Sequence, residues 1–140
     1  MSSVTRDELL EMLYLSAFAK IYQFELFSFG DGECTLIVPF QKSLERAGGF
    51  VAGSVFVTAA DVTMWLAIAS RLGTAELTVT TSMNTLFLKS ARAEKFNCTA
   101  RILKVGRSLI CGIAECAASK GEILSHSTIT YARIARQQVP

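Results

Sequence analysis

The chain has 140 residues, of which 51% are hydrophobic and 19% are charged, and its formal net charge is +2. This composition is typical of a folded globular domain and not of a disordered segment, so we treat residues 1–140 as one domain. The small net charge excludes the strongly basic character of most nucleic-acid-binding proteins, and we expect no nucleic-acid partner.

The cysteine and histidine content argues for a cytoplasmic protein without a metal site. Four cysteines, at positions 34, 98, 111 and 116, form no CxxC pair, and His126 is the only histidine. No basic segment followed by an apolar run marks a signal peptide at the N-terminus. Free, mostly buried thiols fit a reducing compartment, and a single histidine on a predicted strand is no basis for a metal centre.

The N-terminal segment, within residues 1–20, predicts an amphipathic helix over residues 5–20. Thr5 and Glu8 have the spacing of a capping box at its start. Apolar residues then recur at helical intervals, at Leu9, Leu10, Leu13 and Ala17.

Two strands are expected next, over residues 22–29 and 33–40. The intervening Gly30-Asp31-Gly32 is a hairpin signal, and Pro39 limits the second strand to a sheet edge or to its own end. Residues 41–49 form a polar connection with a double glycine.

A long apolar helix is predicted over residues 54–71, closed by Gly73, and four strands follow it in succession. The strands cover residues 76–89, 94–105, 107–118 and 122–134, and we expect them to form a meander. On the first of them, simple alternation places Thr80 and Asn84 on one face. A single apolar helix must be covered on most sides, so the sequence predicts an α+β fold with a curved antiparallel sheet wrapped around one long central helix.

Asp61 is the only charged residue between Arg46 and Arg71. A carboxylate within an apolar helix is costly unless it has polar partners or a chemical task. Helical spacing supplies such neighbours, because one stripe of the helix carries Ser54, Thr58, Asp61 and Trp65. A purely structural role, in which the carboxylate only hydrogen-bonds an interface or a neighbouring element, is the alternative.

Residues 50–70 are also about long enough to span a bilayer. Asp61 would then lie near the bilayer centre, at a cost on the order of 3 kcal/mol. We therefore expect no membrane span.

Four short segments carry a family resemblance: RAGGFVAGS at 46–54, TAADVTM at 58–64, TTSMNTLFLK at 80–89 and KVGRS at 104–108. Together with the order of elements, they resemble the hotdog fold of the thioesterase superfamily, and most closely its PaaI-like (phenylacetate-degradation-type) acyl-CoA thioesterases. The resemblance covers about residues 24–134.

The resemblance implies hydrolysis of a small aromatic or medium-chain acyl-CoA. Asp61 would act as general base or nucleophile, the backbone N–H of Gly53 would hold the oxyanion, and Thr80 would orient the water. The substrate pocket would include Ser54, Thr58, Trp65 and Asn84. Coenzyme A would bind as part of the substrate, with no separate cofactor, at Lys89, Arg92, Gly106, Arg107 and Ser108.

The resemblance also implies a homodimer or a dimer of dimers, in which Asp61 of one subunit faces the Gly53 helix end of the other. Two positions depart from the family pattern: Ala52 stands at the usual histidine and Arg46 at a frequent asparagine. Both changes remove polar groups that would hold the thioester carbonyl or the water. The competing hypothesis is therefore a catalytically silent acyl-CoA-binding or structural hotdog protein.

Overall fold

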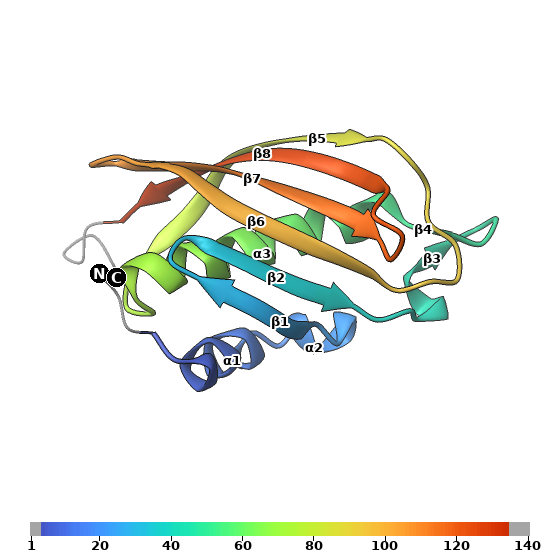
Figure 1. The fold of residues 1–140 in the computed structure, drawn as a ribbon, viewed down its shortest axis with the longest axis horizontal. Helices are drawn as coiled ribbons and strands as arrows, with labels where there is room; N and C mark the ends of the chain where they lie inside the picture. Colours follow the sequence, from blue (N-terminus) through green and yellow to red (C-terminus); the bar gives the residue numbers. More distant parts are fainter. Residues whose placement is uncertain (1–3, 135–140) are drawn as a thin grey trace.

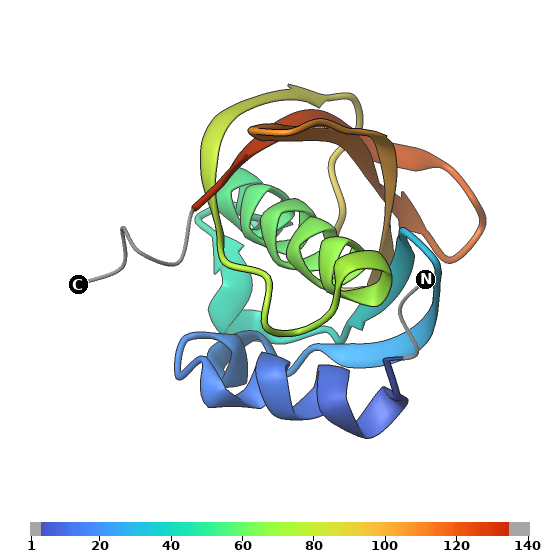
Figure 2. The same ribbon diagram turned by 90° about the vertical axis from the view of Figure 1, so that its left-hand side faces the viewer.

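The structure, a computed structural model, describes residues 4–134; residues 1–3 and 135–140, which fall within the predicted domain, lie outside the described residues. A long helix, α3 (Gly53–Leu72), runs through the centre, and a six-stranded antiparallel sheet curves around it (Figures 1 and 2). The strand order is β1-β2-β6-β7-β8-β5. The strands are β1 (Glu25–Gly30), β2 (Glu33–Val38), β5 (Thr78–Phe87), β6 (Phe96–Val105), β7 (Leu109–Ala118) and β8 (Ile123–Arg133). The predicted α+β architecture is confirmed.

α3 is the core of the protein because nearly every side of it is apolar. Buried side chains along it include Val55, Met64 and Leu66, and Gly73 ends the helix with a φ of 96°. The helix is long and apolar enough to cross a membrane, but 67% of its most apolar window is buried inside the fold, as in the core helix of a globular protein.

The N-terminal helix is shorter than predicted. α1 (Arg6–Leu15) begins with the expected capping box between Thr5 and Glu8, but it ends at Ser16, whose backbone is extended. A separate turn, α2 (Ala19–Tyr22), follows. The break lets α1 lie against α3 while the chain turns into β1 (Figure 2).

The predicted four-strand meander is wrong in one respect. β6, β7 and β8 pair consecutively, but β5 pairs with β8 and forms an edge of the sheet. The connection from β5 to β6 does not make a hairpin. The N–H groups of Leu88 and Lys89 donate to the Leu124 oxygen, and the Ala91 oxygen accepts from Val51. These bonds carry the connection across the end of the sheet.

The polar connection before α3 contains structure that the sequence did not predict. A 3₁₀ turn, η1 (Lys42–Leu44), leads into a two-stranded ribbon of β3 (Glu45–Arg46) and β4 (Phe50–Val51). Its turn requires the double glycine, because Gly48 and Gly49 have φ values of 97° and 81°.

A β-bulge in β5 exchanges the two faces of that strand. The register pairs Thr80 with Tyr131 and then Ser82 with Thr130, so Thr81 is the extra residue. Met83 consequently pairs with the buried Ile129 and faces the helix, as Thr80 does. Asn84 pairs with the exposed Thr128 on the opposite face, so our expectation that Thr80 and Asn84 share a face is wrong.

Candidate active site

Asp61 lies on the stripe of α3 that the sheet covers least. Ser54 is exposed and Thr58, Asp61 and Trp65 are half-buried, whereas most other side chains of the helix are buried. These four positions share one stripe of α3, but Ser54 and Thr58 do not border the cavity that Asp61 and Trp65 share. Asp61 borders a cavity of about 340 Å³, which also reaches Trp65, Thr80 and Tyr131.

Two hydroxyl groups hold the Asp61 carboxylate. Thr80 Oγ1 on β5 donates to Asp61 Oδ1 at 2.7 Å, and the Tyr131 hydroxyl on β8 donates to the same oxygen at 2.6 Å. The Tyr131 hydroxyl is also 2.7 Å from the main-chain oxygen of Asp61. The half-buried carboxylate thus has the polar partners that such a group needs.

Tyr131 was not among the predicted site residues. A signal was present in the sequence, because a tyrosine buried in a strand needs an acceptor for its hydroxyl. Burial first, and then the negative charge of Asp61, raise the pKa of Tyr131 above its ordinary value. The phenol consequently stays protonated and remains a hydrogen-bond donor at neutral and mildly alkaline pH.

Gly53 begins α3 and lies in a second cavity, of about 320 Å³, at the other end of β5. A Cβ at Gly53 would lie 3.2 Å from the ring of Phe87, so a side chain here would crowd the space between the helix start and that ring. The first N–H groups of a helix have no intrahelical acceptor and carry the positive end of its dipole. This helix end can therefore donate to an oxyanion.

Asp61 and Gly53 of one chain do not form a single site. They are eight residues apart on α3, which corresponds to about 12 Å along the helix axis. The attacking water must lie about 3 Å from the carbonyl carbon, and the oxyanion donor must lie about 3 Å from the oxygen of the same carbonyl. One protomer alone does not satisfy this condition.

The cations near Gly53 form a cluster around Phe50. The guanidinium groups of Arg46 and Arg92 lie 5.1 Å and 4.4 Å from the centre of its ring. Arg92 Nη2 also donates to the Gly48 oxygen at 2.6 Å. Lys89 borders the same cavity and pairs with Glu122, whose pKa it lowers through a hydrogen bond and its charge.

The other predicted coenzyme A residues, Gly106, Arg107 and Ser108, lie in the β6–β7 turn. Figure 1 shows this turn at the opposite end of the sheet from the connection that carries Lys89 and Arg92. The Gly106 N–H donates to the Leu109 oxygen at 2.7 Å, so it is engaged within the turn. Arg107 and Ser108 are exposed.

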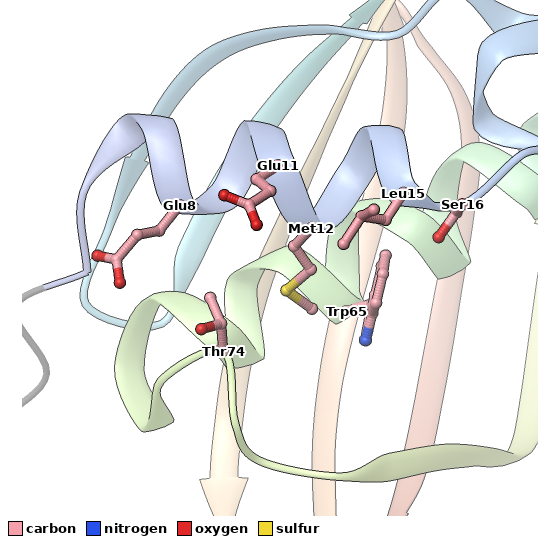
Figure 3. Close-up of a pocket in the computed structure, with 7 residues that line it drawn as sticks. All are labelled: Glu8, Glu11, Met12, Leu15, Ser16, Trp65 and Thr74. Atoms are coloured by element: carbon pink, nitrogen blue, oxygen red, sulfur yellow. The ribbon is translucent and has the colours of Figure 1, made fainter.

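A groove between α1 and α3 adjoins the Asp61 cavity. It has a volume of about 430 Å³, and Trp65 and Ser16 border both spaces. Figure 3 shows Met12 and Leu15 of α1 on the same side as Trp65, with Glu8, Glu11 and Thr74 farther along the groove. The wall next to Asp61 is therefore apolar and the far end is polar.

Known proteins share both the sequence pattern and the fold. The family model described as "Thioesterase superfamily" matches residues 48–125. No curated protein matches the sequence.

Solved structures resemble this chain over most of its length. A conserved protein from Pseudomonas aeruginosa is 26% identical to this chain, with a TM-score of 0.83. The match covers 89% of this chain and 98% of the Pseudomonas protein. The PaaI protein of the Escherichia coli phenylacetic acid degradation operon is 16% identical with a TM-score of 0.84, covering 92% of both chains.

A hypothetical thioesterase from Streptococcus pneumoniae, solved with coenzyme A, is 15% identical with a TM-score of 0.80, covering 91% of this chain and 97% of its own. The family match includes Gly53, Asp61 and Thr80, and the fold is the one that these structures share. The chain belongs to the thioesterase superfamily and has the hotdog fold of its PaaI-like members.

Proposed function

We propose that the protein hydrolyses acyl-CoA thioesters and that Asp61 is the general base. The observation that carries the proposal is the Asp61 carboxylate, held by two hydroxyl donors at the edge of a cavity. Within a thioesterase superfamily domain, an oriented carboxylate in a cavity is suited to activating water.

The reaction needs only water, the thioester and groups of the protein. Asp61 takes a proton from water while the water oxygen forms a bond to the thioester carbonyl carbon. The carbonyl oxygen becomes an oxyanion, to which the Gly53 N–H donates. The carbonyl then re-forms, the C–S bond breaks and the sulfur leaves with its bonding electrons, taking the proton from Asp61 to become the thiol, while the carboxylic acid is released.

The distance between Asp61 and Gly53 within one chain favours a site shared by two subunits. β5 is an edge strand with an unpaired side, and apolar side chains along and beside it are exposed: Leu77, Val79, Leu86, Phe87 and Leu88. A long apolar edge of this kind is a template for pairing with another strand. We infer that a second copy pairs with β5.

Antiparallel pairing of two β5 strands would complete the site. Asp61 adjoins Thr80 near the start of β5, and Gly53 adjoins Phe87 at its end. With a two-fold axis near Met83, the Thr80 end of one strand lies beside the Phe87 end of its copy. Asp61 of one subunit would then face the Gly53 helix end of the other, as the family resemblance implies.

The same pairing would gather the cations proposed for coenzyme A. In one chain, the β5–β6 connection, which carries Lys89 and Arg92, and the β6–β7 turn, which carries Arg107 and Ser108, lie at opposite ends of the sheet (Figure 1). An antiparallel pair places the β6–β7 turn of one subunit near the Lys89 end of the other, where the three cations can contact phosphate groups. The coenzyme A in the Streptococcus pneumoniae structure supports this class of ligand.

The acyl group would extend from Asp61 past Trp65 into the groove between α1 and α3. Met12, Leu15 and Trp65 provide apolar contact for an aromatic or medium-chain group, while Glu8 and Glu11 at the far end disfavour a second carboxylate. Ser54 and Thr58 lie on the same stripe of α3 as Asp61. Asn84, on the outer face, points away from this cavity within its own chain.

The proposal is tested by thiol release from a panel of aromatic and medium-chain acyl-CoA esters, comparing the wild type with Asp61→Asn. The asparagine keeps an oxygen that accepts from Thr80 and Tyr131 but does not take a proton from water. We expect kcat to fall at least about 100-fold with little change in KM.

Equal rates for both proteins would remove Asp61 from catalysis. If the wild type binds coenzyme A but hydrolyses no ester, the catalytically silent binding protein is the better description, and Ala52 and Arg46 would explain the loss.

A further inference from the structure

Tyr131 contacts Asp61, the candidate base, from a distant position in the sequence. It lies on β8, beside Thr80 of β5 in the sheet register, and only 3% of its surface is exposed. Its hydroxyl and the Thr80 hydroxyl both donate to Asp61 Oδ1. Among residues 4–134, Asp61 Oδ2 has no hydrogen-bond partner.

We propose that Tyr131 is a positioning residue that, together with Thr80, occupies Oδ1 and leaves Oδ2 as the oxygen that accepts the proton from water. This inference rests on the proposed function and adds to it an assigned reactive atom and a residue from a different strand.

The geometry makes the two carboxylate oxygens unequal. Oδ1 receives two short hydrogen bonds, which occupy its lone pairs and leave Oδ2 as the oxygen free to accept a further hydrogen bond. The Tyr131 hydroxyl also lies 2.7 Å from the main-chain oxygen of Asp61. One hydroxyl thus contacts both the side chain and the backbone of the same residue. This limits rotation of the carboxylate about the last side-chain bond, whose torsion angle is otherwise broadly distributed. Oδ2 is then held in one direction.

No other charged group competes for this role at the cavity. The elements around Asp61 contribute Ser16 and Phe18 from the α1–α2 region, Val62 and Trp65 from α3, Thr78 to Thr80 from β5 and Tyr131 from β8. Tyr131 is the only titratable neighbour among them. Because burial and then the charge of Asp61 raise the pKa of Tyr131, its phenol stays protonated and donates to Asp61 at neutral pH.

The inference is tested with Tyr131→Phe, which removes the hydroxyl and keeps the ring. We expect kcat to fall about 10- to 100-fold, the range that corresponds to one hydrogen bond to a charged group, with KM nearly unchanged. We also expect the acidic limb of the pH profile of kcat/KM to move to higher pH, because the ionised carboxylate loses a donor.

The matched control is Tyr14→Phe. Tyr14 also donates to an oxygen, that of Phe24 at 2.6 Å, but it does not contact Asp61. Its kcat and acidic limb should equal those of the wild type. A wild-type kcat and an unmoved limb in Tyr131→Phe would overturn the inference while leaving the proposed function intact.

A second measurement requires neither activity nor a variant. In wild-type protein with labelled tyrosine and aspartate, the NMR shift of the Tyr131 Cζ carbon should follow the titration of the Asp61 carboxyl carbon. A Tyr131 Cζ chemical shift that does not change as the Asp61 carboxyl signal changes would overturn the inference. If the wild type hydrolyses none of the esters, the proposed function fails, and this measurement still decides whether Tyr131 holds the carboxylate.

Discussion

At the scale of single residues, the candidate site depends on the neighbours of two residues of α3, Asp61 and Gly53. Asp61 receives donors from two strands, and Gly53 leaves open the space beside Phe87. The buried thiols contribute to packing and not to chemistry. Burial raises the pKa of Cys34 to about 12, which keeps this thiol protonated and unreactive.

The role of Gly53 can be tested with Gly53→Ala. The added methyl group would lie 3.2 Å from the Phe87 ring. In the proposed mechanism it would crowd the helix end to which the thioester carbonyl oxygen binds. We expect kcat/KM to fall at least about 10-fold, with a thermal midpoint close to that of the wild type.

Gly30→Ala is the matched control, because a Cβ at Gly30 meets nothing within 4 Å. Both activity and stability should survive this change. Full activity in Gly53→Ala would argue against an oxyanion donor at this helix end.

At the scale of elements, α3 is tied to the sheet by packing and by one buried serine. Ser70 Oγ accepts from the Gly32 N–H at 2.9 Å and donates to the Ala67 oxygen at 2.6 Å. This links the last turn of α3 to the β1–β2 hairpin. The bulge at Thr81 has a different effect, since it turns Thr80 and Met83 to the same face of β5.

Ser70→Ala should lower the free energy of unfolding by about 1 to 3 kcal/mol, because the buried Gly32 N–H loses its acceptor. Urea denaturation with an unchanged m-value would measure this loss. Ser119→Ala, at an exposed position in the β7–β8 turn, should change the same quantity by less than about 0.5 kcal/mol. Equal effects of the two substitutions would contradict the linking role of Ser70.

At the scale of the whole molecule, the exposed edge of β5 is the feature that a single chain leaves incomplete. Ser82 and Asn84 face outward near the proposed two-fold axis, where their copies would lie close by. If the proposed shared site is correct, the separation of Asp61 from Gly53 along α3 would make catalysis depend on this contact. Assembly and activity should therefore be lost together.

The double variant Ser82→Glu with Asn84→Glu would place like charges across the axis. We expect the dimer dissociation constant to rise about 10-fold or more, measured by light scattering over a concentration series. Activity per subunit should fall in the same concentration range.

Thr128→Glu with Thr130→Glu is the control, because these residues are the register partners of Asn84 and Ser82 on the interior strand β8. It should leave assembly unchanged. A wild-type protein that is monomeric and fully active would contradict the shared site.

The sequence by itself determined the local features of this protein. The lone charge in an apolar segment located Asp61 on α3, helical spacing placed Ser54, Thr58 and Trp65 on the same stripe of that helix, and turn residues marked the β1–β2 hairpin and the end of α3. The boundaries of the strands differ from the predicted ones by a few residues. These features depend on neighbours within a few positions along the chain, which is the range that periodicity and capping patterns report.

Only the tertiary structure decided that β5 pairs with β8, that Thr81 is a bulge, and that Tyr131 holds Asp61 from 70 positions away. Alternation along β5 gave the wrong face for Asn84 because one extra residue reverses every side chain after it. Pairing between distant strands is fixed by how the sheet closes around α3, and no local pattern in the sequence encodes that closure.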